Sequence, residues 1–273
     1  MSETPKLTDR TALEAHRARA RRNPALFLQE AAADDIKDRL AVVNRTFTAP
    51  AIVTTEPALW QSRIPGATCV PDAPVLQLEE GAHDLLIHAL ALHWADDPVG
   101  QLIQCRRALK PDGLFLGVAF GGQTLTELRA ALGQAEIEVT GGLSPRVAPM
   151  ADIRDLGALL QRAGLALPVA DAAPLRVSYE SALHLMRDLR AMGETNALEG
   201  RVRHFSRRAI FLRAAELYAQ TSTTEDGRVL ATYELVTLTG WSPDDSQPQP
   251  LRPGSATTRL ADALGTSETK LKD

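Results

Sequence analysis

Two apolar runs separated by one amphipathic helix place the strongest constraint on the fold. Residues 83–92 and 114–119 are almost continuously hydrophobic, which is typical of parallel strands covered by helices on both faces. Between them, residues 98–109 carry apolar side chains at helical spacing, and a Lys-Pro-Asp-Gly turn at 110–113 leads into the second strand. This segment predicts a strand–helix–strand unit with a right-handed crossover.

The other predicted elements continue the alternation. Thr124 with Glu127 has the spacing of a capping box for one helix, and Asn23 followed by Pro24 favours the start of another. Together the elements predict one doubly wound, mostly parallel α/β sheet. Expected helices cover residues 24–43, 125–137, 153–163, 181–192 and 206–219, and expected strands cover 51–55, 68–70, 175–179 and 228–240.

Composition divides the chain into three regions. They are a basic N-terminal arm at 1–23, a main domain at 24–241 and a flexible tail at 242–273. The arm lacks the apolar core of a secretory signal, and it reads either as a solvated helix or frayed arm, or as a mitochondrial transit peptide. Glu3, Asp9 and Glu14 favour the solvated arm. In the tail we expect one short helix near Leu260.

The composition argues against several classes of protein. A net charge of −4 argues against general nucleic-acid binding, which usually needs a basic surface. No stretch approaches the ~20 consecutive apolar residues of a membrane span. The two cysteines, Cys69 and Cys105, have no CxxC spacing and are too few for a disulfide framework. We therefore expect a reducing, cytoplasmic location.

Several motifs resemble a known family. Residues 84–94 and 109–116 look like the fourth and fifth strands of class I methyltransferases. More specific motifs resemble the methyltransferase-like assembly factors of respiratory complex I and their alphaproteobacterial relatives; these motifs lie at 121–129, 141–146, 188–196 and 226–241. The resemblance runs from about residue 27 to residue 241. A more distant one is to the biotin-pathway enzyme that methylates a malonyl thioester on its carrier protein.

The resemblance implies a fold, a cofactor and a partner. The fold would be the three-layer, Rossmann-like sheet of class I methyltransferases, and the cofactor would be S-adenosylmethionine. The activity would be methylation of a protein substrate, and the partner would be a client subunit of NADH dehydrogenase. Mitochondrial members of the family are assigned arginine hydroxylation of a complex I subunit, so a hydroxylase is another implied activity.

The cofactor loop of that family is missing from this chain. A class I methyltransferase has a GxGxG loop after its first strand, because glycines let the backbone approach the methionine part of the cofactor. Here the strand at 51–55 runs into Glu56 and Pro57, and the next glycine is Gly66. Only about thirty residues separate that strand from Asp84, which is too few for the usual two helices and two strands, because a strand plus a crossover helix already needs a dozen or more. We expect the sheet to lack a helix and a strand in its N-terminal half, and the cofactor site to be incomplete.

Five residues remain as candidates for cofactor binding. By resemblance, Asp72 falls where an acidic residue meets the adenine amino group. His88, Ala89 and Leu90 lie at the carboxyl end of the central strand, where open α/β sheets bind ligands, and His93 follows them. Three of them have a structural alternative: Asp72 could be a turn residue between two prolines, His88 a hydrogen-bonded histidine at a strand end, and His93 a residue that packs against the start of the next helix.

Other chemistry finds less support in the sequence. His83, His88, His93 and Asp96 could supply the two histidines and one carboxylate of an iron site, but their spacing is not that of metal ligands, and we expect no metal. There is no GxSxG elbow or phosphate-binding loop, so no catalytic residue is assigned. A basic cluster is either a solvated helix start or a patch for an acidic partner; it comprises Arg201, Arg203, His204, Arg207 and Arg208.

Two functions stay open. One is an enzyme, a methyltransferase or hydroxylase with an altered cofactor pocket. The other is a binding protein that has kept the sheet and uses the segments at 121–122, 144–146 and 193–196 to recognise a client subunit. Function is a property of the site rather than of the fold, so the damaged cofactor loop favours the second.

Overall fold

The computed structural model describes residues 6–248 and 258–267 of the chain. The chain divides between Pro243 and Asp244 into two compact units. In the second unit, α9 (Leu260–Leu264) confirms the short helix expected near Leu260, whereas positions 249–254 of the predicted tail lie outside the described residues. None of the described helices combines the length and apolar character that a bilayer crossing requires.

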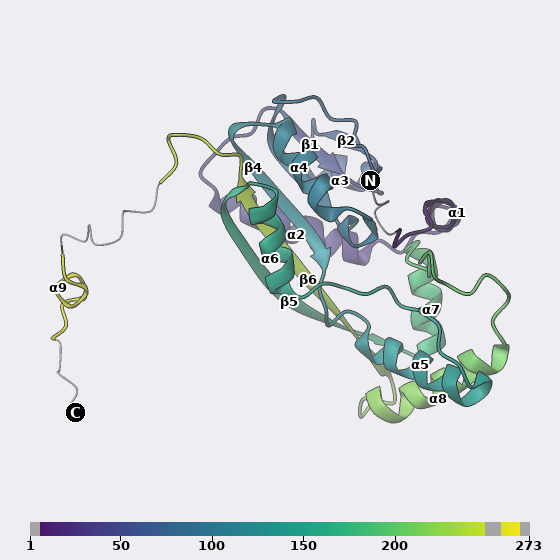
Figure 1. Ribbon diagram of the computed structural model, residues 1–273. Helices are drawn as coiled ribbons and strands as arrows, with labels where there is room; N and C mark the ends of the chain where they lie inside the picture. Colours follow the sequence, from purple (N-terminus) through teal and green to yellow (C-terminus); the bar gives the residue numbers. More distant parts are fainter. Residues whose placement is uncertain (1–5, 249–257, 268–273) are drawn as a thin grey trace. The chain divides into compact units, whose positions relative to one another are not determined.

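The first unit is built on one six-stranded sheet with the order β2-β1-β3-β4-β6-β5 (Figure 1). Strands β2, β1, β3 and β4 are parallel, while β6 runs antiparallel to both β4 and β5. The three-layer α/β fold expected from the sequence is confirmed, and the sheet is mixed. The strands are β1 (Pro50–Val53), β2 (Thr68–Val70), β3 (His83–Ala89), β4 (Leu109–Phe120), β5 (Ala166–Tyr179) and β6 (Val229–Trp241).

Helices cover both faces of the sheet. On one face pack α2 (Phe27–Val42) and α3 (Pro57–Arg63), and on the other pack α4 (Pro98–Ala108) and α6 (Ile153–Arg162) (Figure 1). Side chains of each strand alternate between these layers: Leu85 and Ile87 belong to the α2 side, and Leu86 belongs to the α4 side. Three further helices gather beyond the end of β4; they are α5 (Thr126–Thr140), α7 (Ala182–Ala191) and α8 (Arg208–Ser222).

The connection from β1 to β3 is as short as the sequence indicates. Residues 54–82 form one helix, α3, and one three-residue edge strand, β2. No helix was expected from the sequence within residues 56–67, but α3 forms there, and Pro57 stands in its first turn, where the missing N–H is not needed. The Trp60 side chain is fully buried and its Nε1 donates to Gln29 Oε1 at 2.9 Å, which ties the short helix to α2.

The described part of the N-terminal arm is a helix that is packed along one side and exposed along the other. Residues Arg10–Ala20 form α1, which begins at Asp9, whose side chain accepts from Ala12 N at 3.0 Å. Leu13 is fully buried beneath the helix, and Asp9 N donates to Ala197 O at 2.8 Å. The expected helix is therefore present, but its buried side was not predicted, because the apolar contacts of α1 lie far along the chain, where a local charge pattern does not reveal them.

Two predicted helix starts are also corrected. Helix α5 begins after Leu125, and the hydroxyl of Thr124 donates to Glu234 O instead of capping the helix. Glu127 accepts from the Thr232 hydroxyl at 2.5 Å, so the expected capping box is used to join α5 to β6. Helix α2 begins after Leu26 without a side-chain cap, so Asn23 and Pro24 do not start it.

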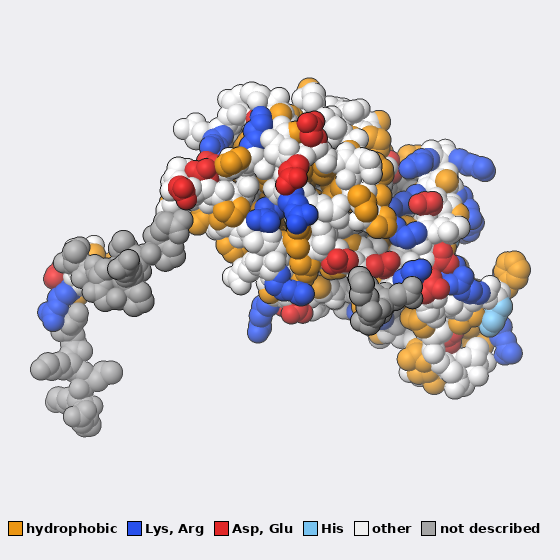
Figure 2. Space-filling view, turned by 45° about the horizontal axis from the view of Figure 1, so that its top comes forward, with side chains coloured by type: hydrophobic (Ala, Val, Ile, Leu, Met, Phe, Trp, Pro, Cys, Tyr) orange, Lys and Arg blue, Asp and Glu red, His pale blue; other side chains and the backbone are white. Residues whose placement is uncertain are grey.

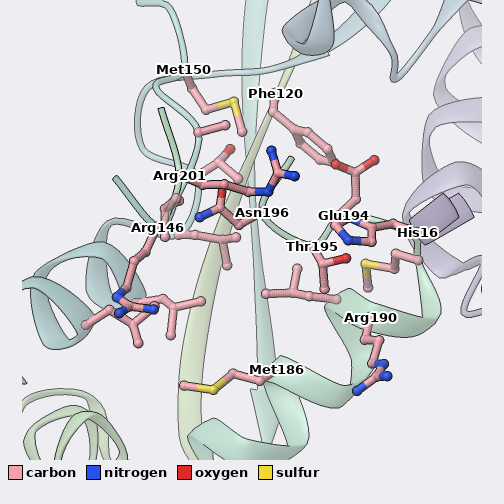
Figure 3. A pocket seen from close by; sticks show the side chains of 18 of the residues that line it. His16, Phe120, Arg146, Met150, Met186, Arg190, Glu194, Thr195, Asn196 and Arg201 are labelled. Carbon is pink, nitrogen blue, oxygen red and sulfur yellow. The ribbon is translucent and has the colours of Figure 1, made fainter. Parts of the chain in front are cut away.

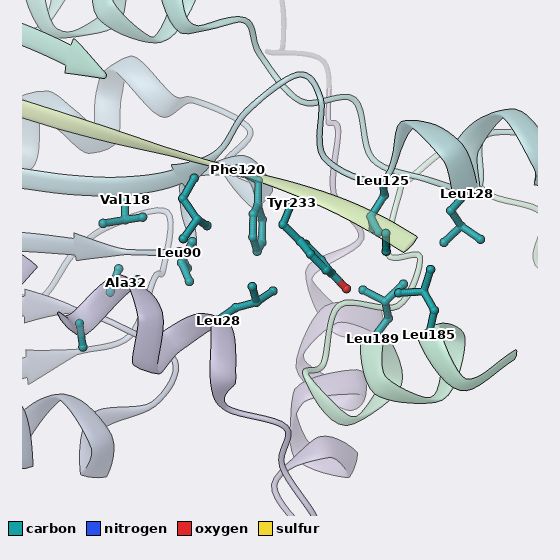
Figure 4. Close-up of a cluster of buried hydrophobic side chains, with 14 of the residues drawn as sticks. Leu28, Ala32, Leu90, Val118, Phe120, Leu125, Leu128, Leu185, Leu189 and Tyr233 are labelled. Carbon is teal, nitrogen blue, oxygen red and sulfur yellow. The ribbon is translucent and has the colours of Figure 1, made fainter. Parts of the chain in front are cut away.

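A cluster of large apolar side chains supports the carboxyl end of β4. Phe120 of β4 and Tyr233 of β6 lie with their ring centroids 6.3 Å apart, between Leu28 of α2 and Leu189 of α7 (Figure 4). All four side chains are buried. This packing fixes the three helices beyond the sheet against the strand ends, and it forms the floor of the pocket described below.

Candidate functional site

A crevice lies at the carboxyl ends of β1 and β2, where a class I sheet would hold its cofactor. Its volume is 620 Å³. The strand side of the crevice is formed by Thr54, Thr55 and Pro57 after β1 and by residues 69–74 around the end of β2. Its other wall is α1, which contributes Arg10, Glu14, Arg17, Ala18 and Arg21.

Two arginines of α1 hold Asp72 in this crevice. Arg17 Nη1 donates to Asp72 Oδ1 at 2.7 Å, and Arg10 Nη1 donates to Oδ2 at 3.3 Å. Arg10 also donates to the backbone carbonyl of Asp72. The side chains of Asp72 and Arg17 are 6% and 11% exposed, so this is a largely buried ion pair. Asp72 is therefore more than a turn residue, since it anchors the N-terminal helix.

The crevice does not fit S-adenosylmethionine in the usual way. The turn after β1 consists of Thr54, Thr55, Glu56 and Pro57, so it offers no glycine for close backbone approach. Both oxygens of Asp72 already accept from guanidinium groups of the chain itself. Three arginines against two carboxylates line the cavity, which disfavours the positive sulfonium of the cofactor.

The other predicted cofactor residues do not converge on the crevice. His88 is 1% exposed and faces α4, with its Nε2 2.9 Å from Gln101 Oε1; burial lowers the pKa of this histidine. Ala89 and Leu90 are buried in the core on the α2 side. The ring of His93 packs on Phe120 with centroids 4.9 Å apart. A role of these residues in cofactor binding stays a prediction.

The four residues considered for a metal have separate partners. His83 Nδ1 lies 3.1 Å from Ala49 O, and Asp96 accepts from the backbone N–H groups of residues 7 and 8. His88 is bonded to Gln101, as described above. Within residues 6–248 and 258–267, no three His, Cys, Asp or Glu side chains gather as metal ligands would.

A second, more apolar pocket lies beyond the end of β4, between α5, α7 and α8 (Figure 3). Its volume is 460 Å³. We call it the α5–α8 pocket. Its apolar lining includes Phe120, Leu128, Met150, Met186, Met192, Phe211 and Tyr233. Its polar lining includes His16, Ser144, Arg146, Arg190, Glu194, Thr195, Asn196, Arg201 and Ser206.

Arg146 joins the walls of this pocket. Its Nη2 and Nε donate to the two carboxylate oxygens of Glu136 at 2.6 and 2.9 Å, and its Nη1 donates to Ser206 Oγ at 3.0 Å. Glu136 also accepts from the Ser144 hydroxyl at 2.8 Å. The hydrogen bonds from Arg146 are the main reason why the pKa of Glu136 falls to about 2. One guanidinium thus holds α5, the loop 141–152 and the loop before α8 together.

Glu194 forms a second buried polar centre beside the pocket. Its Oε2 accepts from Trp94 Nε1 at 2.7 Å and lies 3.0 Å from His93 Nε2. Burial opposes ionisation of Glu194, but the charge and hydrogen bond of His93, the charge of Arg17 and the hydrogen bond of Trp94 outweigh it and lower the pKa of the carboxyl. The predicted packing role of His93 is therefore joined to a hydrogen-bonding role at the pocket edge.

The two loops that carry family-like motifs meet at this pocket. Asn196 Nδ2 donates to Pro145 O at 2.8 Å. Gly193 has φ +80°, and a Cβ there would lie 3.1 Å from Arg17 Cγ, so glycine allows α1 to dock and to bring His16 to the pocket wall. The motifs at 141–146 and 188–196 signalled these loops in sequence, but they did not single out Arg146, Glu194 or His16 as site residues.

Comparisons with known proteins agree with this architecture. Residues 45–117 match the family model of a methyltransferase domain. The YcgJ protein of Bacillus subtilis superposes with a TM-score of 0.50 at 10% identity, covering 79% of this chain and 99% of that one, which shows the fold alone.

Sequence relatives are much closer. The mitochondrial arginine-hydroxylase NDUFAF5 of Danio rerio is 40% identical over 201 residues, which is 74% of this chain and 62% of that protein. The human protein of the same name is 39% identical over 74% of this chain and 58% of its own length. The malonyl-[acyl-carrier protein] O-methyltransferase of Laribacter hongkongensis is 36% identical, covering 67% and 58%. The match therefore spans about three fifths of each relative.

Proposed function

This chain belongs to the family of the mitochondrial NDUFAF5 proteins, and we propose that it is an assembly factor for NADH dehydrogenase that binds a client subunit without using S-adenosylmethionine. One contrast between the two sites carries the proposal. Helix α1 forms one wall of the crevice and neutralises Asp72 through an ion pair, whereas the α5–α8 pocket is fully formed. Cysteine usage supports a cytoplasmic location as part of the same proposal.

The crevice and the α5–α8 pocket differ in whether they keep the features of a binding site. The crevice has lost the glycine turn and holds its acidic residue in an internal ion pair. The α5–α8 pocket keeps an apolar lining with a few fixed polar groups, the arrangement that is typical of binding sites. Retention of the second site without the first supports binding of a protein segment rather than methyl transfer.

Calorimetric titration with S-adenosylmethionine tests the cofactor part of this proposal. We expect no heat of binding from the full-length chain, because Asp72 is held in an internal ion pair and the turn after β1 has no glycine. An active class I methyltransferase titrated in the same buffer is the positive control. Micromolar binding would overturn the proposal and return Asp72, His88, Ala89, Leu90 and His93 to the candidate cofactor site.

Deletion of the gene in its host tests the client part. We expect the amount of assembled NADH dehydrogenase, measured by native gel and by NADH oxidation in membranes, to fall, and expression of the intact chain to restore it. Normal levels in the deletion strain would contradict a role in assembly.

An enzyme is the second candidate. Identity of about 40% to proteins named arginine hydroxylases favours it, as does the presence of an ionised carboxylate, Glu194, at the edge of a pocket large enough for a side chain. Both a methyltransferase and an arginine hydroxylase in this family would use the class I fold, so cofactor binding in the titration above is the observation that would favour this candidate.

A further inference from the structure

We propose that the loop at residues 200–208 is the outer docking surface for the client, and that it receives an acidic segment carrying an apolar anchor residue. We call residues 200–208 the docking loop. The inference rests on the proposed function for the existence of a client and adds the chemistry by which that client is recognised.

Phe205 is the most exposed large apolar side chain of the described residues. Its relative exposure is 102%, which means that no neighbour covers the ring. Aromatic side chains are enriched at the centres of protein interfaces, because they bury a large area with few rotatable bonds. In the space-filling view a hydrophobic side chain projects beside a histidine and basic side chains at one edge of the molecule (Figure 2).

The charge around Phe205 is positive and unbalanced. In the described chain, Arg207 and Arg208 have no ion pair or side-chain hydrogen bond. They stand at the first residues of α8, where the helix dipole disfavours cations, and no acidic residue occupies that first turn. An acidic partner would relieve both effects.

Nearby carboxylates cannot supply that balance, because each already has a partner. Glu199 accepts from Arg203 at 2.8 Å, and Glu136 is held by Arg146. Glu138 accepts from Arg213 at 2.6 Å. None of these three carboxylates is therefore free to pair with Arg207 or Arg208, and an acidic partner would supply the missing groups.

The docking loop is continuous with the α5–α8 pocket. Arg201, Val202 and Ser206 line that pocket from the loop, and Ser206 Oγ accepts from Arg146. A segment lying on the loop can therefore insert an apolar side chain between Met186 and Phe211.

Two polar atoms in the pocket wall await a partner. His16 Nδ1 and Thr195 Oγ1 are buried atoms with no hydrogen-bond partner among the described residues, although the His16 ring also interacts with the backbone of Thr195. Buried polar groups of this kind are usually paired, and the amide groups of an entering peptide would pair them. Such pairing favours a protein segment over an anionic lipid surface, which could bind Phe205 and the arginines but could not fill the pocket.

Fluorescence anisotropy with designed peptides tests the chemistry. The probe is a labelled amphipathic peptide of about 14 residues with Leu and Met on one face and Glu on the other, and its match replaces every Glu with Lys. We expect the acidic peptide to bind and the basic one not to bind. Arg207→Glu with Arg208→Glu should weaken the acidic peptide about tenfold or more, and Phe205→Ser should weaken it several-fold.

The control carries the same charge change elsewhere. Arg154→Glu with Arg162→Glu places two reversals on exposed positions of α6, and it should leave peptide binding unchanged. Circular dichroism confirms that each variant is folded. Equal binding of the two peptides, or no binding of either, would overturn the docking surface. So would binding of phosphatidylglycerol vesicles that depends on Phe205 while the acidic peptide fails to bind.

Complementation of the gene deletion separates this inference from the proposed function. If deletion lowers NADH dehydrogenase but the Arg207→Glu, Arg208→Glu chain restores it fully, the docking surface is wrong and the proposed function stands. If deletion has no effect while the peptide results hold, the proposed function is wrong and the docking surface stands.

Discussion

Asp72→Ala is expected to lower the free energy of unfolding by about 3 kcal/mol, because removing one partner of a buried ion pair leaves the other charge uncompensated. Arg17 is 11% exposed at the side chain and Arg10 is 23% exposed, so neither guanidinium can fully rehydrate without moving α1. Urea unfolding followed by circular dichroism measures the loss. Faster tryptic cleavage within residues 10–22 should accompany it as the helix loosens.

A matched control separates burial from mere ion pairing. Asp34 forms an ion pair with Arg63 at 2.8 Å, but its side chain is 59% exposed. Asp34→Ala should therefore cost less than about 1 kcal/mol. The double change Asp72→Ala, Arg17→Met removes the unpaired cation and should recover part of the loss. Equal losses for Asp72→Ala and Asp34→Ala would show that α1 is not anchored by this pair.

The sheet was predictable because burial imposes a pattern on the sequence. Residues 85–87 of β3 are apolar and residues 114–120 of β4 are apolar apart from one glycine, since helices cover both faces of these strands. The expected strand at 228–240 is confirmed as β6, in which Tyr233 and Leu235 join the core on the α2 side, whereas Val236 and Leu238 join the α4 side. Local periodicity is sufficient for such elements.

Contacts between distant segments were not predictable in this way. Arg17 and Asp72 lie 55 residues apart, and nothing in the charge pattern of the arm indicates that one of its arginines reaches the end of β2. Thr124 and Glu127 have capping spacing, yet the nearby backbone and side chains of β6 compete for the same oxygens. In each case a tertiary partner decides between two chemically reasonable local roles.

Only part of the candidate site was predictable, because its residues also come from segments that are distant in the sequence. Resemblance drew attention to the loops at 141–146 and 188–196, and the structure brings them together through Asn196 and Pro145. His88, Ala89 and Leu90 were instead chosen as cofactor candidates by their position at the end of the central strand. In the structure His88 lies against α4 and Leu90 lies in the core. The local backbone conformation decides where a side chain at a strand end points, and the position in the sequence does not reveal it.

Glu136→Gln is expected to lower the free energy of unfolding by about 2 kcal/mol at neutral pH, and the effect should vanish in acid. Glu136 has a pKa of about 2 in the folded chain, lowered chiefly by the hydrogen bonds of Arg146, against 4.5 as its ordinary value. Because the folded pKa is the lower one, the carboxylate stabilises the protein fully above pH 4.5, and this stability is lost as the pH falls towards 2.

The measurement compares urea unfolding of the two proteins at a series of pH values from neutral to acid. The difference between native chain and Glu136→Gln should stay constant down to about pH 5 and lose roughly half its value by about pH 3. Glu216→Gln is the control, since Glu216 is 63% exposed in its contact with Arg213 and should change stability by less than about 1 kcal/mol. If the Glu136→Gln difference does not change with pH, the carboxylate is not held by Arg146. Contacts other than the Arg146–Glu136 hydrogen bonds would then have to hold the walls of the α5–α8 pocket together.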